Sequence, residues 1–252
     1  MPYNADIYYY AYHNEDTERI PVVLIHGAGG NHLHWPIQIR RLPEYKVYAL
    51  DLPGHGKSKG HGWQQISYYS EQVIAWMDEV GLHKAVLVGH SMGGAIALDM
   101  ALQYPQRIRG LALVGTGANL PVNDTFLENT SHETTFQSVV EMLTSWGFNL
   151  GTDPQLVQTA RKQMLETRPT ILHGDFAACA DFDVRDRLEE ITCPTQVICG
   201  SEDKLTPIRH SQYLADHIVS AELAVIPDAG HMVMLEKPEH VAATLEEFLT
   251  KI

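Results

Sequence analysis

Short runs of aliphatic residues recur along the chain at the length of buried strands. Each run holds four to six residues and has Gly or Pro close by, as is typical of strands bounded by turns. The runs cover residues 20–25, 47–50, 84–88, 111–114 and 195–198. They are apolar at successive positions instead of alternating with polar residues, and this pattern predicts a parallel sheet that is buried on both faces.

Segments with helical periodicity lie between these runs, at residues 70–80, 95–104, 210–217 and 238–249. The last segment opens on Pro238, and proline is favoured in the first turn of a helix. Strands that alternate with helices predict an α/β fold, with a mostly parallel central sheet and helices on both faces. Tyr8-Tyr9-Tyr10 and the run 223–226 are expected to complete the ends of the sheet.

The alternation stops between residues 119 and 187, where we find no strand candidate. Large apolar residues recur there at helix-like spacing. They are Phe126, Phe136, Leu143, Trp146, Phe148, Leu156 and Met164. We therefore predict a helical cap formed by residues 119–187, inserted into a core domain that consists of residues 1–118 and 188–252.

The charge balance narrows the class of partner. The 252 residues include 18 Lys or Arg and 31 Asp or Glu, so the formal net charge is −13. This charge repels nucleic acid and anionic lipid headgroups, and we expect neither as a partner.

We see no run long enough to span a membrane and no basic start followed by an apolar run, so we expect neither a membrane span nor a signal peptide. Cys179, Cys193 and Cys199 do not make a disulfide framework, and we expect a cytoplasmic protein with reduced thiols.

The strongest chemical signal is Gly89-His90-Ser91-Met92-Gly93, which lies between a predicted strand and a predicted helix. Gly-x-Ser-x-Gly in this context is typical of a nucleophile elbow, a tight turn that holds a serine hydroxyl above the sheet. The two glycines remove side chains that would collide in such a turn. The helix that follows directs N–H groups and its positive dipole end toward an oxyanion on the attacked carbon.

A serine hydroxyl is a weak nucleophile and needs a base. Gly230-His231 follows the run 223–226, and Gly200-Ser201-Glu202-Asp203 follows the run 195–198. Loops that follow the strands of a parallel sheet meet at one rim, so we expect these side chains near Ser91. The order serine, acid, histidine along the chain is the order found in α/β-hydrolases.

Five motifs in order resemble a known family. They are His26-Gly27-Ala28-Gly29-Gly30, Asp51-Leu52-Pro53-Gly54-His55-Gly56, the Ser91 elbow, the segment 200–207, and Gly230-His231. Together they are similar to the serine hydrolases of the α/β-hydrolase fold, in their compact form with a helical cap, as in carboxylesterases, monoacylglycerol lipases and the pimeloyl carrier-protein methyl ester esterase. The resemblance covers nearly the full length of the chain.

The resemblance implies a role for each residue of a catalytic triad. Ser91 is the nucleophile, His231 is the general base and then the general acid, and Asp203 holds the imidazole in its productive tautomer. Asp203 fills the family position in Gly-x-x-Asp-x-x-x-Pro. Glu202 remains an alternative acid by spacing, and Asp124, after the run 111–114, is a more remote one.

An oxyanion hole requires two backbone donors. The elbow supplies the N–H of Met92, the residue after the nucleophile. The resemblance places the second donor in the loop that follows the run 20–25, at Ala28. Small residues in that loop allow a backbone N–H to approach the substrate.

The substrate pocket is expected between the cap and these motifs. The cap candidates are Phe126, Phe136, Leu143, Trp146 and Phe148, and the candidates beside motif positions are Met92, Leu205 and Met232. A bounded apolar pocket of this kind favours small to medium substrates over polymers.

Fourteen histidines raise the question of a metal site. His32 and His34 are close together, but a spacing of two does not place both on one face of a helix. No Cys or carboxylate nearby completes a ligand set. We therefore expect no metal and no cofactor, and we assign His26, His55 and His90 to the turns that their motifs form.

These features predict a cofactor-free carboxylesterase that acts on a small-molecule ester of small to medium acyl chain. Carbon–carbon bond hydrolases, enol-lactonases and carrier-protein methyl esterases share the same triad and remain alternatives. A non-catalytic ligand receptor on the same fold is the alternative from another class, and the presence of all the triad and oxyanion positions argues against it.

Overall fold

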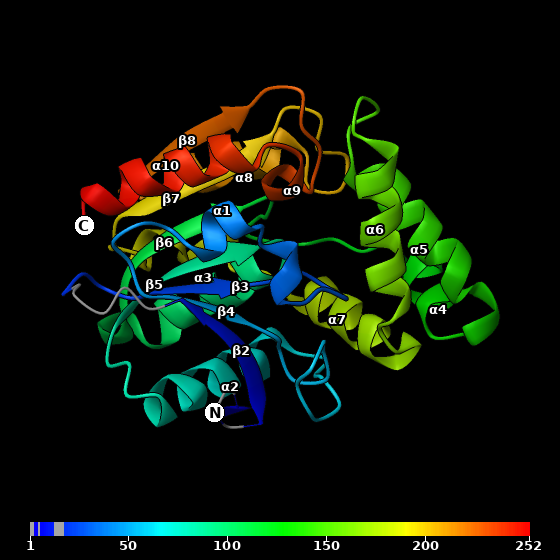
Figure 1. Ribbon diagram of the computed structural model, residues 1–252, viewed down its shortest axis with the longest axis horizontal. Helices are drawn as coiled ribbons and strands as arrows, with labels where there is room; N and C mark the ends of the chain where they lie inside the picture. The colour runs from blue at the N-terminus through cyan, green and yellow to red at the C-terminus, as the bar shows by residue number, and fades with distance from the viewer. Residues whose placement is uncertain (1–2, 5, 13–17) are drawn as a thin grey trace.

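The described residues form a central sheet of eight strands. Figure 1 shows this sheet with helices on both sides. The structure is a computed structural model, and it describes residues 3–4, 6–12 and 18–252. The strands are β1 (Tyr3–Asn4), β2 (Ile7–Tyr12), β3 (Val22–Ile25), β4 (Val47–Leu50), β5 (Ala85–His90), β6 (Ile108–Val114), β7 (Thr195–Gly200) and β8 (Ala221–Ile226). Their order is β1-β2-β4-β3-β5-β6-β7-β8. Strand β2 is antiparallel to β1 and β4, and all other neighbours are parallel, which confirms the predicted α/β fold.

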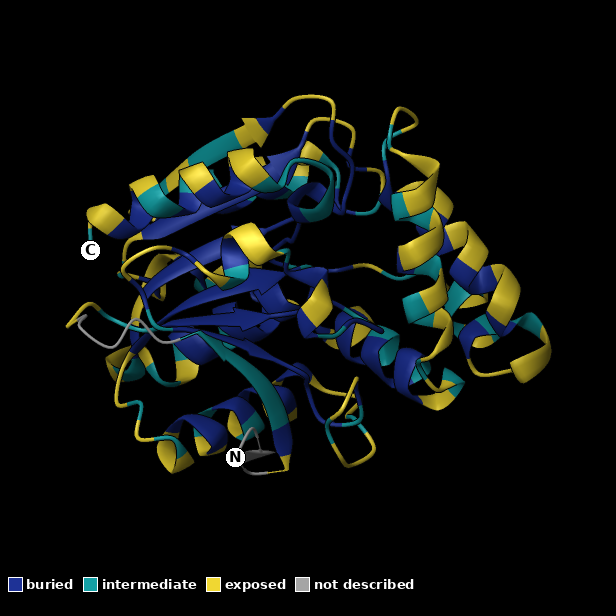
Figure 2. Cartoon of the chain, viewed as in Figure 1, coloured by how far each residue is buried: buried dark blue, intermediate teal, exposed yellow. Residues whose placement is uncertain are grey.

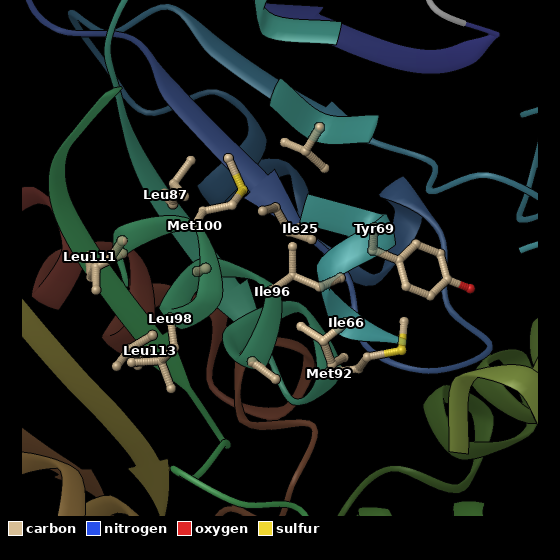
Figure 3. Packing of buried hydrophobic residues seen from close by; sticks show 14 of the residues in the cluster. Ile25, Ile66, Tyr69, Leu87, Met92, Ile96, Leu98, Met100, Leu111 and Leu113 are labelled. Atoms are coloured by element: carbon tan, nitrogen blue, oxygen red, sulfur yellow. The ribbon is translucent and has the colours of Figure 1, made fainter. Parts of the chain in front are cut away.

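Both faces of the sheet are apolar, because successive residues of a strand point to opposite sides. In β3, Val23 and Ile25 join the core cluster on one face, and Val22 and Leu24 join the cluster on the other. Helices α2 (Ile66–Glu79), α3 (Met92–Gln103) and α8 (Ile208–His217) cover the first face, and α1 (Ile37–Arg40) and α10 (Pro238–Thr250) cover the second. Figure 2 shows the buried strands between helices with exposed outer sides, and Figure 3 shows the packing around α3.

The predicted elements are present, with shifted ends. Strand β5 extends to His90, two residues beyond its prediction, and α3 begins at Met92 instead of residue 95, because Ser91 is its N-cap. Helix α2 begins at Ile66, before the predicted residue 70. The tyrosine run lies in β2, as expected, but β2 is not the edge of the sheet. Strand β1 pairs with β2 and forms this end. Residues 1–2, 5 and 13–17 of the predicted core domain lie outside the described residues.

Four helices occupy the segment predicted as a cap. They are α4 (Asp124–Thr130), α5 (Glu133–Gly147), α6 (Pro154–Leu165) and α7 (Pro169–Asp181). Helices α4, α5 and α6 stand apart from the sheet, and α7 lies between them and the sheet (Figure 1). Ala178 and Cys179 of α7 pack in the main core cluster. Helix α7 therefore connects the predicted cap to the core, and the division into two units remains a prediction.

The remaining elements are short. They are α9 (Val233–Glu236) and three 3-10 helices, η1 (His32–His34), η2 (Pro105–Arg107) and η3 (Arg185–Glu190). Among all the helices of the described residues, none is long and apolar enough to cross a membrane. Cys179, Cys193 and Cys199 are free thiols.

Candidate active site

Ser91 lies in the sharp turn between β5 and α3 with an unusual backbone conformation. Its φ is 53° and its ψ is −117°, a combination that costs free energy in a non-glycine residue. Hydrogen bonds on both sides of the residue hold this conformation: the Ser91 N–H donates to the Val114 carbonyl at 2.9 Å, and the Ser91 carbonyl accepts from the Thr116 hydroxyl and from the Gly94 N–H, both at 2.8 Å. The turn leaves Ser91 half-buried on the wall of a cavity.

The glycines on either side of Ser91 are required by close backbone approaches. A Cβ at Gly89 would lie 2.2 Å from the Gly93 carbonyl oxygen, and a Cβ at Gly93 would lie 2.2 Å from the Ile25 carbonyl oxygen. Real Cβ atoms do not approach this closely. The elbow therefore packs directly on the end of β3, which carries the loop with Ala28.

We expect Gly93→Ala to lower the free energy of unfolding by about 3 kcal/mol or more, because backbone atoms would have to move. Chemical denaturation measures this loss. Gly151→Ala is the matched control: Gly151 is exposed with no atom within 4 Å of its added Cβ, so we expect a change within about 0.5 kcal/mol. Equal stability of the two variants would contradict this description of the elbow.

His231 and Asp203 form a buried pair at the ends of β8 and β7. The His231 Nδ1 lies 2.9 Å from Asp203 Oδ2, and both side chains are almost inaccessible to solvent. A carboxylate accepts, so Nδ1 carries the hydrogen and Nε2 is left as an acceptor. This is the tautomer that a general base needs.

Thr206 completes the surroundings of the Asp203 carboxylate. The Thr206 hydroxyl donates to Oδ2 at 2.8 Å, and the backbone N–H groups of Leu205 and Thr206 donate to Oδ1 at 2.9 and 2.8 Å. Burial alone would raise the pKa of Asp203, but the His231 ring and these hydrogen bonds outweigh burial and hold the pKa below its ordinary value. Asp203 is therefore ionised at neutral pH.

The structure separates Asp203 from the two alternative acids. Glu202 is exposed, and its Oε1 contacts the hydroxyl of Ser201 at 3.3 Å. Asp124 is exposed in the first turn of α4. Among the three acids considered, Asp203 alone contacts the His231 ring.

His90 connects the histidine to the elbow. The His90 Nε2–H donates to the carbonyl oxygen of His231 at 3.0 Å, and the two ring centroids lie 4.7 Å apart. His90 directly precedes Ser91, and both Ser91 and His231 line the same cavity. The structure thus brings Ser91, His231 and Asp203 to one rim of the sheet.

The two expected oxyanion donors lie where they can reach that rim. Met92 is the first residue of α3, and Ala28 follows β3 and lines the cavity. Neither the Met92 N–H nor the Ala28 N–H has a hydrogen-bond acceptor among the described residues. Both N–H groups are free to donate to an oxygen of a ligand.

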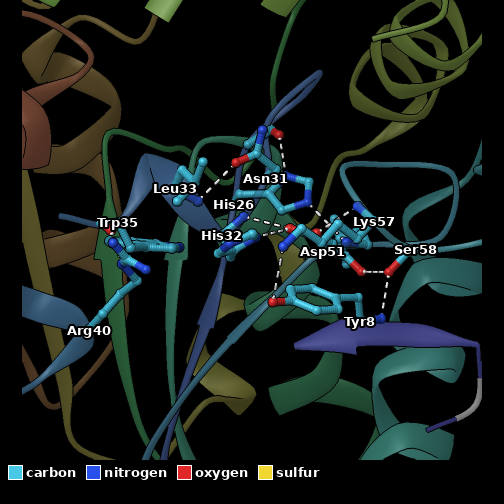
Figure 4. A network of polar contacts seen from close by, with 12 residues as sticks. Tyr8, His26, Asn31, His32, Leu33, Trp35, Arg40, Asp51, Lys57 and Ser58 are labelled. Atoms are coloured by element: carbon cyan, nitrogen blue, oxygen red, sulfur yellow. Dashed lines mark hydrogen bonds and ion pairs between the residues drawn. The ribbon is translucent and has the colours of Figure 1, made fainter. Parts of the chain in front are cut away.

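Figure 4 shows how buried polar groups fix the loop that contains Ala28. Asp51 Oδ1 accepts hydrogen bonds from the backbone N–H and from Nδ1 of His32, both at 2.7 Å. The His26 Nδ1–H donates to the Gly27 carbonyl at 2.8 Å, and the Leu52 N–H donates to His26 Nε2 at 3.0 Å. Burial keeps the pKa of His26 well below its usual range. These histidines hold the backbone of the loop.

The cavity above Ser91 has a volume of about 690 Å³, which suits a small ligand. Six predicted pocket residues line it: Phe126, Leu143, Trp146, Phe148, Leu205 and Met232. Further polar lining comes from Asn123, Thr125, Asn129, Thr135, Ser138 and Lys204. None of the described lining residues is acidic, so the negative charge of the chain is kept away from the wall of the cavity.

Two predicted pocket residues lie elsewhere. Phe136 is buried in a cluster with Val140 of α5 and Leu172 of α7, and it is not among the described residues that line the cavity. The Met92 side chain is fully buried in the core cluster that Figure 3 shows, and it is not among the described residues that line the cavity.

The sequence reasoning missed three polar residues of the site: Thr206, His34 and His90. His34 and His90 line the cavity, and neither nitrogen of His34 nor Nδ1 of His90 has a hydrogen-bond partner among the described residues. Burial lowers the pKa of His34 to about 4 and places that of His90 well below its usual range, so both rings are neutral. No group of three His, Cys, Asp or Glu among the described residues could hold a metal ion.

Comparisons with known proteins show the family of this chain and its fold. A family model described as the alpha/beta hydrolase fold matches residues 20–238. The dihydrolipoyllysine-residue acetyltransferase component of the acetoin cleaving system of Pseudomonas putida is 34% identical over 246 residues, and the match covers 92% of this chain but 64% of that protein. This chain therefore spans less than two thirds of the length of that relative.

Two further similarities extend over both proteins. The pimeloyl-[acyl-carrier protein] methyl ester esterase of Aromatoleum aromaticum is 27% identical over 249 residues, and the match covers 91% of this chain and 98% of that enzyme. The solved structure of a thermophilic esterase is 33% identical, with a TM-score of 0.82, and the match covers 97% of this chain and 98% of that one.

Proposed function

Because this chain belongs to the alpha/beta hydrolase fold family, we propose that it is a serine hydrolase that cleaves carboxylic esters of small to medium acyl chain. The observation that carries the proposal is the buried pair of His231 and Asp203, in which His231 lines the same cavity as the strained Ser91 turn. The similarity to a thermophilic esterase supports the ester as the substrate class.

The first half of the reaction forms an acyl-enzyme. Ser91 Oγ attacks the ester carbonyl carbon, and its proton passes to His231 Nε2. The N–H groups of Met92 and Ala28 donate to the oxyanion that develops. The carbon–oxygen bond to the alcohol then breaks, and His231 gives its proton to the departing oxygen.

The second half releases the acid. A water molecule loses a proton to His231 Nε2 and attacks the acyl carbon, and the bond to Ser91 Oγ breaks as His231 returns the proton to that oxygen. Asp203 stays ionised throughout, because its pKa is held low, and it stabilises the imidazolium that forms twice in each turnover.

The cavity supports a bounded range of substrates. Apolar side chains from the cap and the rim, among them Phe126, Leu143 and Phe148, form much of its wall. Trp146 also lines the cavity and is 46% exposed, which places it at the mouth. We therefore expect the cavity to enclose small to medium acyl chains and to leave part of a longer chain outside.

The test is the initial rate of hydrolysis of p-nitrophenyl esters from acetate to palmitate. We expect kcat/KM to be highest for short to medium acyl chains and to fall by about tenfold or more for palmitate, because a long chain cannot be enclosed in the cavity. A maximum at palmitate would contradict the proposed size range and would favour a lipase. No hydrolysis of any ester in the series would contradict the proposed substrate class.

A further inference from the structure

A buried carboxylate links the predicted cap to the core beside the candidate oxyanion hole. Asp175 lies in α7 and is fully buried. Its Oδ2 accepts from the Gly29 N–H at 2.8 Å and from His55 Nε2 at 2.7 Å, and its Oδ1 accepts from the Tyr69 hydroxyl at 2.6 Å. All three donors belong to elements outside the cap segment.

The Gly29 contact is the one that bears on the proposed reaction. Gly29 directly follows Ala28, whose N–H is the second candidate oxyanion donor. The Gly29 N–H donates to Asp175, and its carbonyl accepts from the Thr167 hydroxyl at 2.9 Å, so residues of the cap segment hold both sides of Gly29. Its φ is +63°, and an added Cβ would lie 2.7 Å from Leu172 of α7. The loop that contains Ala28 and Gly29 therefore packs closely on α7.

The hydrogen bonds of His55 identify the link as a buried ion pair. The His55 Nδ1 lies 3.1 Å from the Pro53 carbonyl, which can only accept, and Nε2 faces the Asp175 carboxylate. Both nitrogens therefore donate, and the ring carries a positive charge. Burial alone would lower the pKa of His55, but Asp175 outweighs it and the pKa is raised.

A buried ion pair is a poor way to stabilise the packing of two elements. Two desolvated charges gain little net stability over apolar residues of similar volume, although removal of one partner is costly. A charged acceptor does, however, fix the direction of a backbone N–H more strongly than a neutral one. Asp175 is the charged acceptor of the Gly29 N–H, so it fixes the orientation of the peptide group that joins Ala28 to Gly29.

We infer that Asp175 is a positioning residue, which orients the Ala28 N–H toward the developing oxyanion and thereby makes the oxyanion hole dependent on the placement of α7. This inference rests on the proposed function. It predicts that loss of the carboxylate weakens stabilisation of the transition state more than it weakens substrate binding.

The test is Asp175→Asn, a change that keeps the shape but removes the charge and places a donor among three donors. We expect kcat for a p-nitrophenyl ester to fall by about 10- to 100-fold with KM changed by less than about threefold. We expect the rate at which a fluorophosphonate labels Ser91 to fall by a similar factor, because the phosphoryl oxygen occupies the same hole. Both are measured well below the melting temperature of each variant.

Tyr69→Phe is the matched control. It removes a hydrogen bond to the same buried carboxylate, but from α2, and Tyr69 does not line the cavity. We expect it to lower the melting temperature yet leave kcat and the labelling rate within about threefold of wild type. Thr167→Val removes the hydrogen bond to the Gly29 carbonyl and is expected to lower both rates in the same direction as Asp175→Asn, by a smaller factor.

Rates of Asp175→Asn within about threefold of wild type would overturn the inference, as would an equal loss in Tyr69→Phe, since both outcomes mean a role in stability alone. If Asp175→Asn does not fold, unchanged rates in Thr167→Val overturn it instead. A wild-type protein that hydrolyses no ester contradicts the proposed function and not this inference, which the labelling rates then decide.

Discussion

Ser91→Ala is expected to lower kcat for ester hydrolysis by about four to six orders of magnitude. The variant lacks the oxygen that forms the acyl-enzyme, and no other hydroxyl occupies the elbow. Alanine fits the space that serine leaves, and the hydrogen bonds of the residue 91 backbone do not involve its side chain. We therefore expect a folded protein with a far-UV circular dichroism spectrum like that of wild type.

Initial rates on a short-chain p-nitrophenyl ester measure this loss. Ser201→Ala is the matched control, because Ser201 is an exposed serine that follows β7 and does not line the cavity. Its rate should stay within about threefold of wild type. A Ser91→Ala protein that retains a tenth of the wild-type activity or more would rule out Ser91 as the nucleophile.

Asp203→Asn is expected to lower kcat by about 10⁴-fold. The asparagine amide can donate to Nδ1 of His231, which favours the tautomer with its hydrogen on Nε2, and that tautomer cannot accept the proton of Ser91. The loss should be in kcat with little change in KM, because Asp203 does not line the cavity. Glu202→Gln removes a neighbouring exposed carboxylate and should leave the rate within about threefold of wild type.

The same substitution has a predictable effect on stability against pH. Because the folded pKa of Asp203 is lowered, its stabilising contribution is present above the ordinary value of 3.8 and is lost as the pH falls through the lower folded value. The free energies of unfolding of wild type and Asp203→Asn should therefore differ most near neutral pH and converge in strong acid.

Equal rates of ester hydrolysis for Asp203→Asn and wild type, or a large loss of rate in Glu202→Gln, would contradict the assignment of Asp203 as the acid of the triad.

Much of the fold is predictable from the sequence because its signals are local. The strands are continuous apolar runs, and Gly89 and Gly93 bracket a serine in a turn where a Cβ would meet backbone oxygen. The family resemblance drawn from five motifs is confirmed by the match over residues 20–238. The end of β5 and the start of α3 were misplaced by two and three residues, since a helix that starts directly at the elbow has no separate capping residue to read.

The parts of the site that depend on distant contacts could not be predicted. Asp175 lies 146 residues from Gly29 in the sequence, and nothing local distinguishes it from an exposed acid on a helix. Phe136 and Leu143 have the same helical spacing, but only the packing of α5 decides which of them meets the cavity. The contact of Asp203 with the Leu205 N–H could have been found, because an aspartate in a turn commonly accepts from the backbone two residues on.

The central claim is that ester hydrolysis passes through an acyl-enzyme on Ser91. The most direct measurement is to quench the reaction with a slowly hydrolysed p-nitrophenyl ester within the first turnover and to map the intact and digested protein by mass spectrometry. The account predicts one acyl group for each chain, on the peptide that contains Ser91, and none in Ser91→Ala. Product formation without any acylated Ser91 peptide, or an acyl group on another residue that still turns over, would contradict it.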